Sequence, residues 1–371
     1  MGRFNIPLFK LNYDKNEENA VLRTMKSQWI SSGPKVNKLE KKFSEIIGTR
    51  YSLATSNCTS SLHLAVLTAG IKHGDEVLCP SLTFVATVNS ILYVGAVPVF
   101  CDIKSESELT ISPDDIERKI TSKTKAIIVM HYAGFPCDMK RIMKISRKYK
   151  LKVIEDACHA PLSEYQGRKL GTFGVSSCYS FYSNKNISTG EGGMFNTNIK
   201  QYFQQAKLLR SHGISTTSFD RLKDSKDYNV LGAGYNYRMD DLRASIALVQ
   251  LEKLKMDIYR RAKVRKLYLK YLTNINSVKI PFVNYDGNYS NYIFPILVQN
   301  RDQVRKYLLK KGIQTSIHYK PVHRLSTYEK YYLELPLTDL VYSKLLTLPM
   351  YGSLKLVEIK YIVNSLAEIV K

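Results

Sequence analysis

A lysine in a loop of small residues is the first candidate for chemistry. Lys185 follows an apolar, aromatic run and precedes a Gly-Glu-Gly-Gly turn in the segment SFYSNKNISTGEGGMF. A lysine in such a loop can reach into a cleft, where partial burial and a cationic neighbour would remove its proton and make the amine a nucleophile. The alternative is an ordinary surface lysine, which describes most of the 55 lysine and arginine residues.

A pair of carboxylates is the second candidate. Glu155 and Asp156 end a buried, strand-like run in the segment VIEDACHA. A carboxylate in this position is costly unless it is exposed or meets a positive partner. Asp156 therefore has either a functional role or the role of an N-cap for a following helix, and the sequence leaves both open.

A helix start rich in small hydroxyl residues is the third candidate. In TSNCTSSLHLAVLTAG, the hydroxyls of Thr59 and Ser60 precede a helix pattern with an apolar face. Free N–H groups at a helix start, together with hydroxyls, bind phosphate, although simple N-capping explains the same residues.

These segments together contain the parts that a pyridoxal phosphate cofactor requires. The lysine would form a Schiff base with it, and the aspartate would keep the pyridine nitrogen protonated so that the ring accepts electrons. Phe84, in SLTFVAT, would stack on the face of that ring.

The elements that must position these residues alternate between residues 51 and 200. The apolar runs predict strands at Glu76–Cys79, Val97–Cys101, Lys125–Met130, Lys152–Glu155 and Ser177–Phe181. The amphipathic segments predict helices at Leu62–Ala69, Val85–Tyr93, Met139–Tyr149 and Ile199–Ser211. This alternation predicts an α/β fold whose large, mostly parallel sheet has helices on both faces. Ligands of such sheets bind beyond the carboxyl ends of the strands.

The last third of the chain predicts a second, smaller α/β domain. A long helical pattern from Met239 to Tyr271 leads into a strand at Tyr292–Val298 and helices at Asp302–Lys311 and Leu356–Val370. We therefore predict a large domain over residues 1–245, followed by a linker helix and a small domain over residues 246–371.

Composition limits the class of protein. A hydrophobic content of 44% and a charged content of 23% are ordinary for a soluble globular chain. No apolar run has the roughly 18 residues that span a bilayer, and the first residues lack a signal-peptide pattern. We therefore expect a cytoplasmic protein without a membrane partner. The six cysteines form neither a C-x-x-C pair nor a metal-site pattern, which predicts buried thiols and no metal.

The formal net charge of +23 would suit nucleic acid or a small anionic substrate. No nucleic-acid-binding module is visible in the sequence, so we expect no nucleic-acid partner. An anionic substrate would account for the charge, and a lysine-rich surface without a binding role would account for it equally well.

A resemblance to a known family extends over nearly the whole chain. It rests on WISSG (residues 29–33), the phosphate-loop segment, GDEVLCPSLTFVATVNSI, VMHYAGFPCD, VIEDACHA, SFYSNKNISTGEGGM, SHGI, GYNYRM and HYKPVH. With these motifs in this order, the chain resembles the DegT-type sugar aminotransferases, which are pyridoxal-phosphate-dependent transferases of the aspartate-aminotransferase fold (fold type I). Within the family it is most similar to members that aminate C4 of a nucleotide-linked 4-keto-6-deoxy sugar or 4-keto pentose.

The resemblance implies a role for each matching residue. Lys185 would be the Schiff-base lysine and the proton shuttle, Asp156 would hold the pyridinium, and His159 would lie near the phenolic oxygen of the cofactor. The remaining implied cofactor ligands would hold its phosphate: Thr59, Ser60, Ser180 and, from a partner subunit, Asn236. The last role implies a homodimer with shared active sites. The residues implied to line the sugar pocket are Ser32, His318, Tyr319 and His323.

The implied reaction is a ping-pong transamination. L-glutamate would leave as 2-oxoglutarate and convert the cofactor to pyridoxamine 5′-phosphate, which would then aminate a nucleotide-diphosphate keto-sugar. Amination at C3 or of a cyclitol ketone remains open, as does a non-enzymatic regulator that senses the cofactor or an amino sugar. Relatives that dehydrate sugars have histidine in place of the Schiff-base lysine, so Lys185 argues against that reaction.

Overall fold

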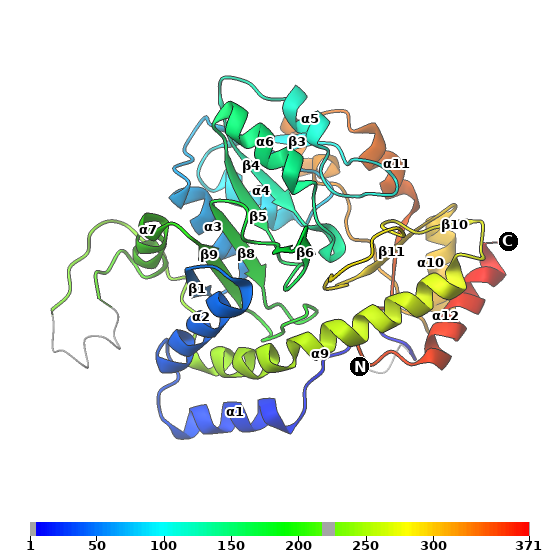
Figure 1. Ribbon diagram of the computed structural model, residues 1–371, viewed down its shortest axis with the longest axis horizontal. Coiled ribbons are helices and arrows are strands. Elements are labelled where there is room, and N and C mark those ends of the chain that lie inside the picture. Colours follow the sequence, from blue (N-terminus) through cyan, green and yellow to red (C-terminus); the bar gives the residue numbers. More distant parts are fainter. Residues whose placement is uncertain (1–4, 217–226, 371) are drawn as a thin grey trace.

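The computed structural model describes residues 5–216 and 227–370 of the chain (Figure 1). Its α-helices are α1 (Lys15–Lys26), α2 (Pro34–Ile47), α3 (Cys58–Thr68), α4 (Val85–Leu92), α5 (Pro113–Arg118), α6 (Met139–Tyr149), α7 (Lys200–Arg210), α9 (Asp241–Leu272), α10 (Arg301–Lys310), α11 (Pro336–Lys344) and α12 (Leu356–Ile369). Its strands are β1 (Tyr51–Thr55), β2 (Glu76–Pro80), β3 (Val97–Cys101), β4 (Thr124–Met130), β5 (Lys152–Asp156), β6 (Glu164–Tyr165), β7 (Arg168–Lys169), β8 (Ser176–Ser180), β9 (Gly193–Thr197), β10 (Val278–Lys279), β11 (Phe294–Val298) and β12 (Leu345–Leu348).

The large sheet has seven strands in the order β1-β9-β8-β5-β4-β2-β3. Strands β3, β2, β4, β5 and β8 pair in parallel, whereas β9 pairs antiparallel with both β8 and β1. The prediction of an α/β fold with a large, mostly parallel sheet is confirmed. The carboxyl ends of β4, β5 and β8 therefore meet at one edge of the sheet, where ligands of such folds bind.

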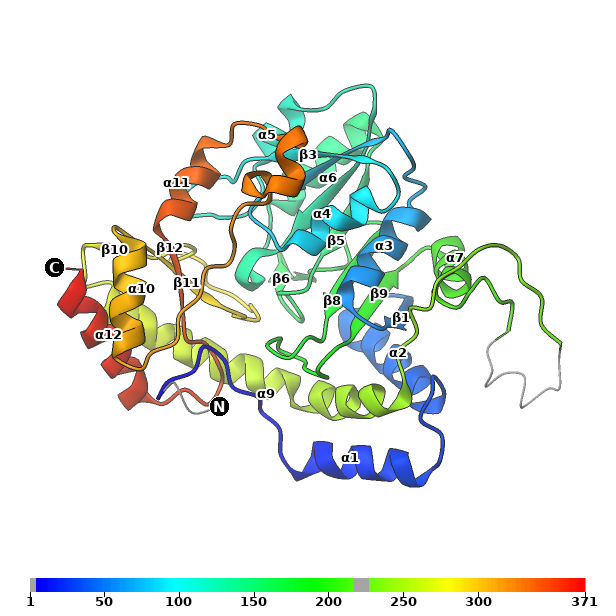
Figure 2. The ribbon, with the colours of Figure 1, turned by 180° about the vertical axis from the view of Figure 1, so that it is seen from behind.

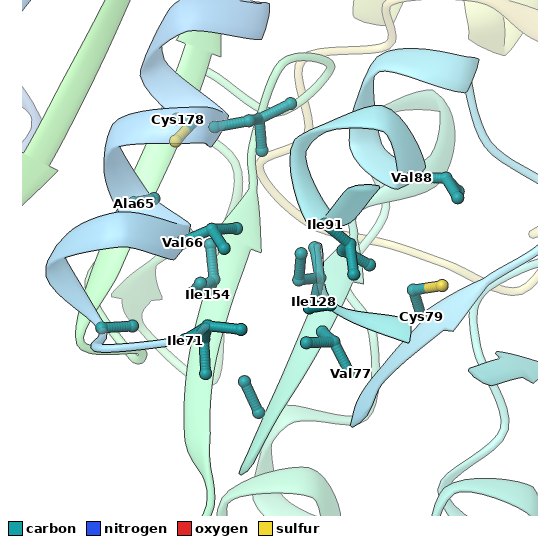
Figure 3. Packing of buried hydrophobic residues seen from close by; sticks show 14 of the residues in the cluster. Ala65, Val66, Ile71, Val77, Cys79, Val88, Ile91, Ile128, Ile154 and Cys178 are labelled. Carbon is teal, nitrogen blue, oxygen red and sulfur yellow. The ribbon is translucent and has the colours of Figure 1, made fainter. Parts of the chain in front are cut away.

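Helices cover both faces of this sheet because the strands have apolar side chains on both faces. Along β2, Val77 and Cys79 belong to the cluster under α3 and α4, while Leu78 belongs to the cluster under α6. Successive side chains of a strand point to opposite faces, so an unbroken apolar run requires a helix on each side. Figure 3 shows the first cluster, where Ala65, Val66, Val88 and Ile91 from the helices meet Val77, Ile128 and Ile154 from the strands.

A smaller sheet in the last third of the chain has the order β10-β11-β12. Its strands are antiparallel, and they pack with α10, α12 and the second half of α9 around a separate apolar cluster. Ile6 joins this cluster and pairs with Ile313, so residues near the start of the chain lie against its last third. The division into domains near residue 245 stays a prediction.

One helix is shared by the two apolar regions. Helix α9 has 32 residues and runs along the molecule from the large sheet to the small one (Figure 2). Its first half, including Ala244 and Leu254, packs with α2 and the large sheet, and its second half, including Val264 and Leu272, packs in the small cluster.

The element bounds predicted from the sequence agree closely with the structure in the parallel core. Val97–Cys101 and Met139–Tyr149 have the predicted bounds, and the other predicted elements have ends shifted by a few residues. The prediction misses α1, α2, β1 and β9, among others. Within residues 5–216 and 227–370, no helix has the length and apolar character needed to cross a bilayer.

Candidate active site

Asp156 lies at the carboxyl end of β5, beside the first turn of α4. Its carboxylate is buried and accepts a hydrogen bond from each side: Thr87 Oγ1 donates to Oδ2 over 2.7 Å, and the Cys158 N–H donates to Oδ1 over 3.2 Å. No helix follows β5, because residues 157–163 form turns. The N-cap interpretation of Asp156 is therefore wrong.

Glu155, the neighbouring carboxylate, points into the other face of the sheet and is fully buried. Its oxygens accept the N–H groups of Gly171, Phe173 and Gly174, each over 2.7 Å, and lie 3.1 Å from His131 Nε2. Since His131 Nδ1 accepts the Cys137 N–H, the proton of His131 is on Nε2 and is donated to Glu155. These donors explain how a buried carboxylate is tolerated and fix the end of β5.

Replacement of Glu155 by glutamine is expected to lower the free energy of unfolding by about 2–4 kcal/mol. An amide group would turn at least one hydrogen toward donors that now meet a carboxylate oxygen. Urea unfolding monitored by circular dichroism measures the loss. The exposed Glu45→Gln is the matched control, with an expected change within about 0.5 kcal/mol. Equal stability of the two variants would contradict this account of Glu155.

Lys185 lies in the loop between β8 and β9, which is closed by the Thr189 N–H donating to the Phe181 carbonyl over 2.8 Å. Its Nζ lies 3.9 Å from Cys158 Sγ and 4.2 Å from the centroid of the Tyr292 ring. The sequence argument therefore locates the lysine correctly in a loop that turns toward the end of β5.

The charge environment of Lys185 differs from the one expected from the sequence. No cationic neighbour is among its described contacts. Burial favours the neutral amine, but Cys158, Tyr292 and Asp156 outweigh it electrostatically, so the pKa of Lys185 is raised. The free amine is therefore held as an ammonium group in the absence of a covalent partner.

His159 follows Asp156 by three residues and lies against the Lys185 loop. Its Nε2 is 2.9 Å from the Tyr319 hydroxyl, and its buried Nδ1 has no hydrogen-bond partner among the described residues. Burial and the nearby Lys185 hold the pKa of His159 well below its usual value, so the ring is neutral. An unpartnered buried nitrogen here indicates a missing polar partner.

His318 and Tyr319 complete this side of the site. His318 Nδ1 lies 3.0 Å from Thr347 Oγ1, and burial together with Lys185 lowers the pKa of His318 to about 3. The Tyr319 ring lies 5.8 Å from that of Phe84, measured between centroids. Phe84 itself is 53% exposed immediately before α4. Both histidines are thus neutral near pH 7, and aromatic rings border the space beside Asp156.

The start of α3 forms the third part of the site. Asn57 caps this helix, and its Oδ1 accepts both the N–H of Ser60 (2.9 Å) and the Ser60 hydroxyl (3.0 Å). No hydrogen bond joins the Thr59 hydroxyl to another described residue. Gly193 packs so closely here that a Cβ on it would lie 2.5 Å from the carbonyl carbon of Asn57. Because Ser180 pairs with Gly193, Ser180 lies beside the helix start.

The remaining predicted residues lie farther from Lys185. His323 is fully buried, with Nδ1 2.6 Å from Ser81 Oγ and Nε2 3.2 Å from Asp339 Oδ1, and no described contact joins it to Lys185. Ser32 is half-buried before α2, and Asn236 is exposed on the segment that pairs with Ser211. The structure brings together the predicted cofactor residues of this chain, whereas His323 supports the end of β2.

Three residues of the site were not identified as candidates from the sequence: Thr87, Cys158 and Tyr292. Thr87 lies in the motif GDEVLCPSLTFVATVNSI and Cys158 in VIEDACHA, and membership of these motifs is the only sequence signal for either residue. Tyr292 is one of 26 tyrosines and begins a predicted strand more than a hundred residues after Lys185, so no local pattern distinguishes it.

The arrangement fits pyridoxal phosphate. The helix start at α3 with its glycine-lined floor would hold the phosphate, Asp156 would face the pyridine nitrogen, and the unpartnered His159 Nδ1 would face a polar ring substituent. Lys185 would supply the amine that such a cofactor binds covalently.

Comparisons with known proteins agree with this chemistry. A model of the DegT/DnrJ/EryC1/StrS aminotransferase family matches residues 12–367. The chain is 37% identical to the GDP-perosamine synthase of Escherichia coli O157:H7 over 98% of each chain. It is 33% identical to the spore coat polysaccharide biosynthesis protein SpsC of Bacillus subtilis, over 99% of this chain and 97% of that protein.

Solved structures are similar over almost their entire length. Helicobacter pylori PseC, an aminotransferase of pseudoaminic acid biosynthesis, superposes with a TM-score of 0.92 at 27% identity, covering 98% of this chain and 99% of that one. Spr1654 of Streptococcus pneumoniae, a putative sugar aminotransferase, has 26% identity. Its PLP-form gives a TM-score of 0.91 and covers 99% of this chain and 100% of that one, and its PMP-form gives 0.92.

Proposed function

Because the chain belongs to the DegT/DnrJ/EryC1/StrS aminotransferase family and is a pyridoxal-phosphate-dependent transaminase, we propose that it moves an amino group from L-glutamate to a nucleotide-linked keto-sugar. The proposed acceptor carbon is C4 of a 4-keto-6-deoxy sugar or 4-keto pentose. The similarity to GDP-perosamine synthase supports this position, since perosamine is a 4-amino-6-deoxy sugar. The observation that carries the proposal is the convergence of Lys185, Asp156 and the α3 helix start at one sheet edge.

Each side chain of the site has a task in this proposal. When bound, pyridoxal phosphate supplies an electron sink for the carbon that loses a proton. Lys185 binds it covalently at rest and, once released, removes a proton at one carbon and returns it at another. Asp156 keeps the pyridine nitrogen protonated through its negative charge. Thr59, Ser60 and Ser180 hold the phosphate at the start of α3.

The substrate side of the site suits a polar acceptor. His318 interacts electrostatically with the Lys185 amine, and the Tyr319 ring lies 5.0 Å from the His318 ring, measured between centroids. His159 and His318 are neutral, so both donate or accept hydrogen bonds without adding charge. The net charge of +23 would attract a nucleotide diphosphate from solution. All six cysteines are free, which suits work in the reducing cytoplasm.

We also propose that two copies share their active sites. Asn236 is exposed, and three large apolar side chains of the same segment are more than half exposed: Tyr228, Val230 and Leu231. An exposed apolar segment of this kind is expected to be covered by a partner. In a twofold dimer, this segment would bring Asn236 to the phosphate of the other subunit.

Subunits carrying Lys185→Ala and Asn236→Asp are expected to complement each other. Each variant homodimer lacks a working site, but a mixed dimer has one site with both native residues. Coexpression with two affinity tags, followed by isolation of the mixed dimer, should restore about half of the wild-type activity per dimer. Activity no higher than that of the separate homodimers would contradict a shared site.

The proposed reaction is tested with ¹⁵N-labelled L-glutamate and a panel of acceptors that contains nucleotide-linked 4-keto sugars, nucleotide-linked 3-keto sugars and a cyclitol ketone. The expected result is a product whose NMR spectrum places ¹⁵N on C4, together with 2-oxoglutarate. Nitrogen on C3, or amination of a cyclitol ketone alone, would replace the C4 proposal. A protein that converts none of these acceptors would overturn the proposed substrate class.

A further inference from the structure

Tyr292 is held rigidly beside the reactive lysine. Its N–H donates to the Ala133 carbonyl over 3.1 Å, and its own carbonyl accepts from Arg261 Nη1 over 3.2 Å. The adjacent loop is joined to the lysine loop, because Asn186 Nδ2 donates to the Ser290 carbonyl over 3.1 Å. These bonds fix the backbone that carries Tyr292 beside the Lys185 loop, and the ring itself is buried.

The Lys185 amine lies over the face of this ring, with Nζ 4.2 Å from the ring centroid. An ammonium group at this distance from an aromatic face is attracted by the ring's electron density, most strongly where water is excluded. In transamination the lysine must be released from the cofactor, remain close to it and then move a proton. Because the four-carbon side chain of lysine is flexible, an interaction must hold the released amine in one position.

We propose that Tyr292 positions the released Lys185 by holding its ammonium group against the face of the Tyr292 ring. This role deepens the proposed transaminase mechanism and rests on it. Tyr292 is a positioning residue, since it acts on the reaction through Lys185. The neutral released amine takes the proton from the carbon of the substrate, and the ammonium group that forms is stabilised against the ring, close to the Asp156 end of the sheet, until it returns that proton.

The surrounding charges agree with this role. The titratable side chains that interact electrostatically with the Lys185 amine are Cys58, Asp156, Cys158, His159, Tyr292 and His318. Burial raises the pKa of the Cys158 thiol and of the Tyr292 phenol, and it lowers the pKa of both histidines. The attractive partners of the ammonium therefore include the Asp156 carboxylate and Tyr292, which contributes both its ring face and its hydroxyl.

The test varies the ring without changing its shape. Full-length protein is loaded with pyridoxamine 5′-phosphate, so that Lys185 carries no covalent bond, and is labelled with acetic anhydride over a range of pH. Mass spectrometry of the Lys185 peptide gives the pKa of this amine. Position 292 carries tyrosine, phenylalanine, or phenylalanine with increasing numbers of ring fluorines, which withdraw electron density from the face.

The expected result is a pKa of Lys185 that falls in steps as fluorines are added to phenylalanine at position 292, measured from the unfluorinated phenylalanine variant, which already lacks the hydroxyl that interacts with the amine. Tyr292→Leu is expected to lower it by about one unit. A pKa that does not respond to fluorination would overturn the proposal, and this outcome does not depend on the folding of the leucine variant. The same series at Tyr268, a buried ring stacked on Phe294, is the control. An equal fall there would also overturn it.

The acceptor used by the enzyme does not enter this measurement. Failure of the nucleotide-sugar proposal would appear as absent product with wild-type protein, whereas failure of the Tyr292 proposal would appear as an unchanged amine pKa. A second readout is the acid limb of the pH profile of kcat, which should move to lower pH in the fluorinated variants because a less basic amine deprotonates earlier.

Discussion

Lys185→Ala is expected to lower kcat by about 10⁴-fold or more, because it removes both the covalent attachment of the cofactor and the group that moves the proton. The structure supports survival of the fold, since the described contacts of the Lys185 amine include only a long hydrogen bond with Cys158 and the interaction with Tyr292, and no ion pair. The purified variant should bind pyridoxal phosphate without the yellow band that wild-type protein shows and loses on addition of L-glutamate.

The control for this prediction is Lys200→Ala at the exposed start of α7. It should keep the wild-type spectrum and turnover, which separates loss of one particular amine from loss of a positive charge. Full turnover by Lys185→Ala would remove the transaminase mechanism from this site. A colourless wild-type protein, even after added cofactor, would mean that Lys185 does not form the expected covalent bond.

Asp156→Asn is expected to lower kcat by about 10²–10³-fold while the protein stays folded. The amide keeps an oxygen for one of the two donors, Thr87 and the Cys158 N–H, but it carries no negative charge to hold a proton on the pyridine nitrogen. Steady-state kinetics and urea unfolding should be measured on the same preparation, so that lost charge and lost stability can be distinguished.

Thr87→Val separates the effect of the hydrogen bond between Thr87 and Asp156 from the effect of the charge of Asp156. It removes the 2.7 Å hydrogen bond to Oδ2 but leaves the carboxylate charged, so a smaller loss of about tenfold is expected. Thr87→Ser keeps the hydroxyl and should remain close to wild type. If Asp156→Asn were as active as Thr87→Ser, the charge of Asp156 would have no part in the reaction.

The sequence predicts the parallel core well because its signal is local. An apolar run such as Val97–Cys101 and an amphipathic one such as Met139–Tyr149 have recognisable periods and flanking residues, and their bounds agree with the structure. Helices α1 and α2, which the prediction misses, also carry local signals: a capping box of Asp14 with Glu17 in α1, and Pro34 in the first turn of α2.

The parts that sequence reasoning misses depend on distant contacts. Strand β9 begins at Gly193, inside a stretch that reads as a turn, and becomes a strand only because β1 and β8 pair with it on either side. The ring beside the Lys185 amine is likewise a distant contact, since Tyr292 lies more than a hundred residues later in the chain. The sequence indicated the motifs correctly but could not indicate which side chains would surround the amine.

The shared helix α9 has a thermodynamic consequence. Near its middle, Arg261 is buried, pairs with Asp257 over 2.6 Å and donates to the carbonyls of Tyr292 and Met350. Unfolding of the small sheet would remove the carbonyl partners of Arg261 and leave the ion pair with incomplete hydrogen bonding. This ion pair lies in α9, the helix whose first half packs against the large sheet. The two halves of the molecule should therefore melt in one cooperative transition, with calorimetric and van't Hoff enthalpies that coincide.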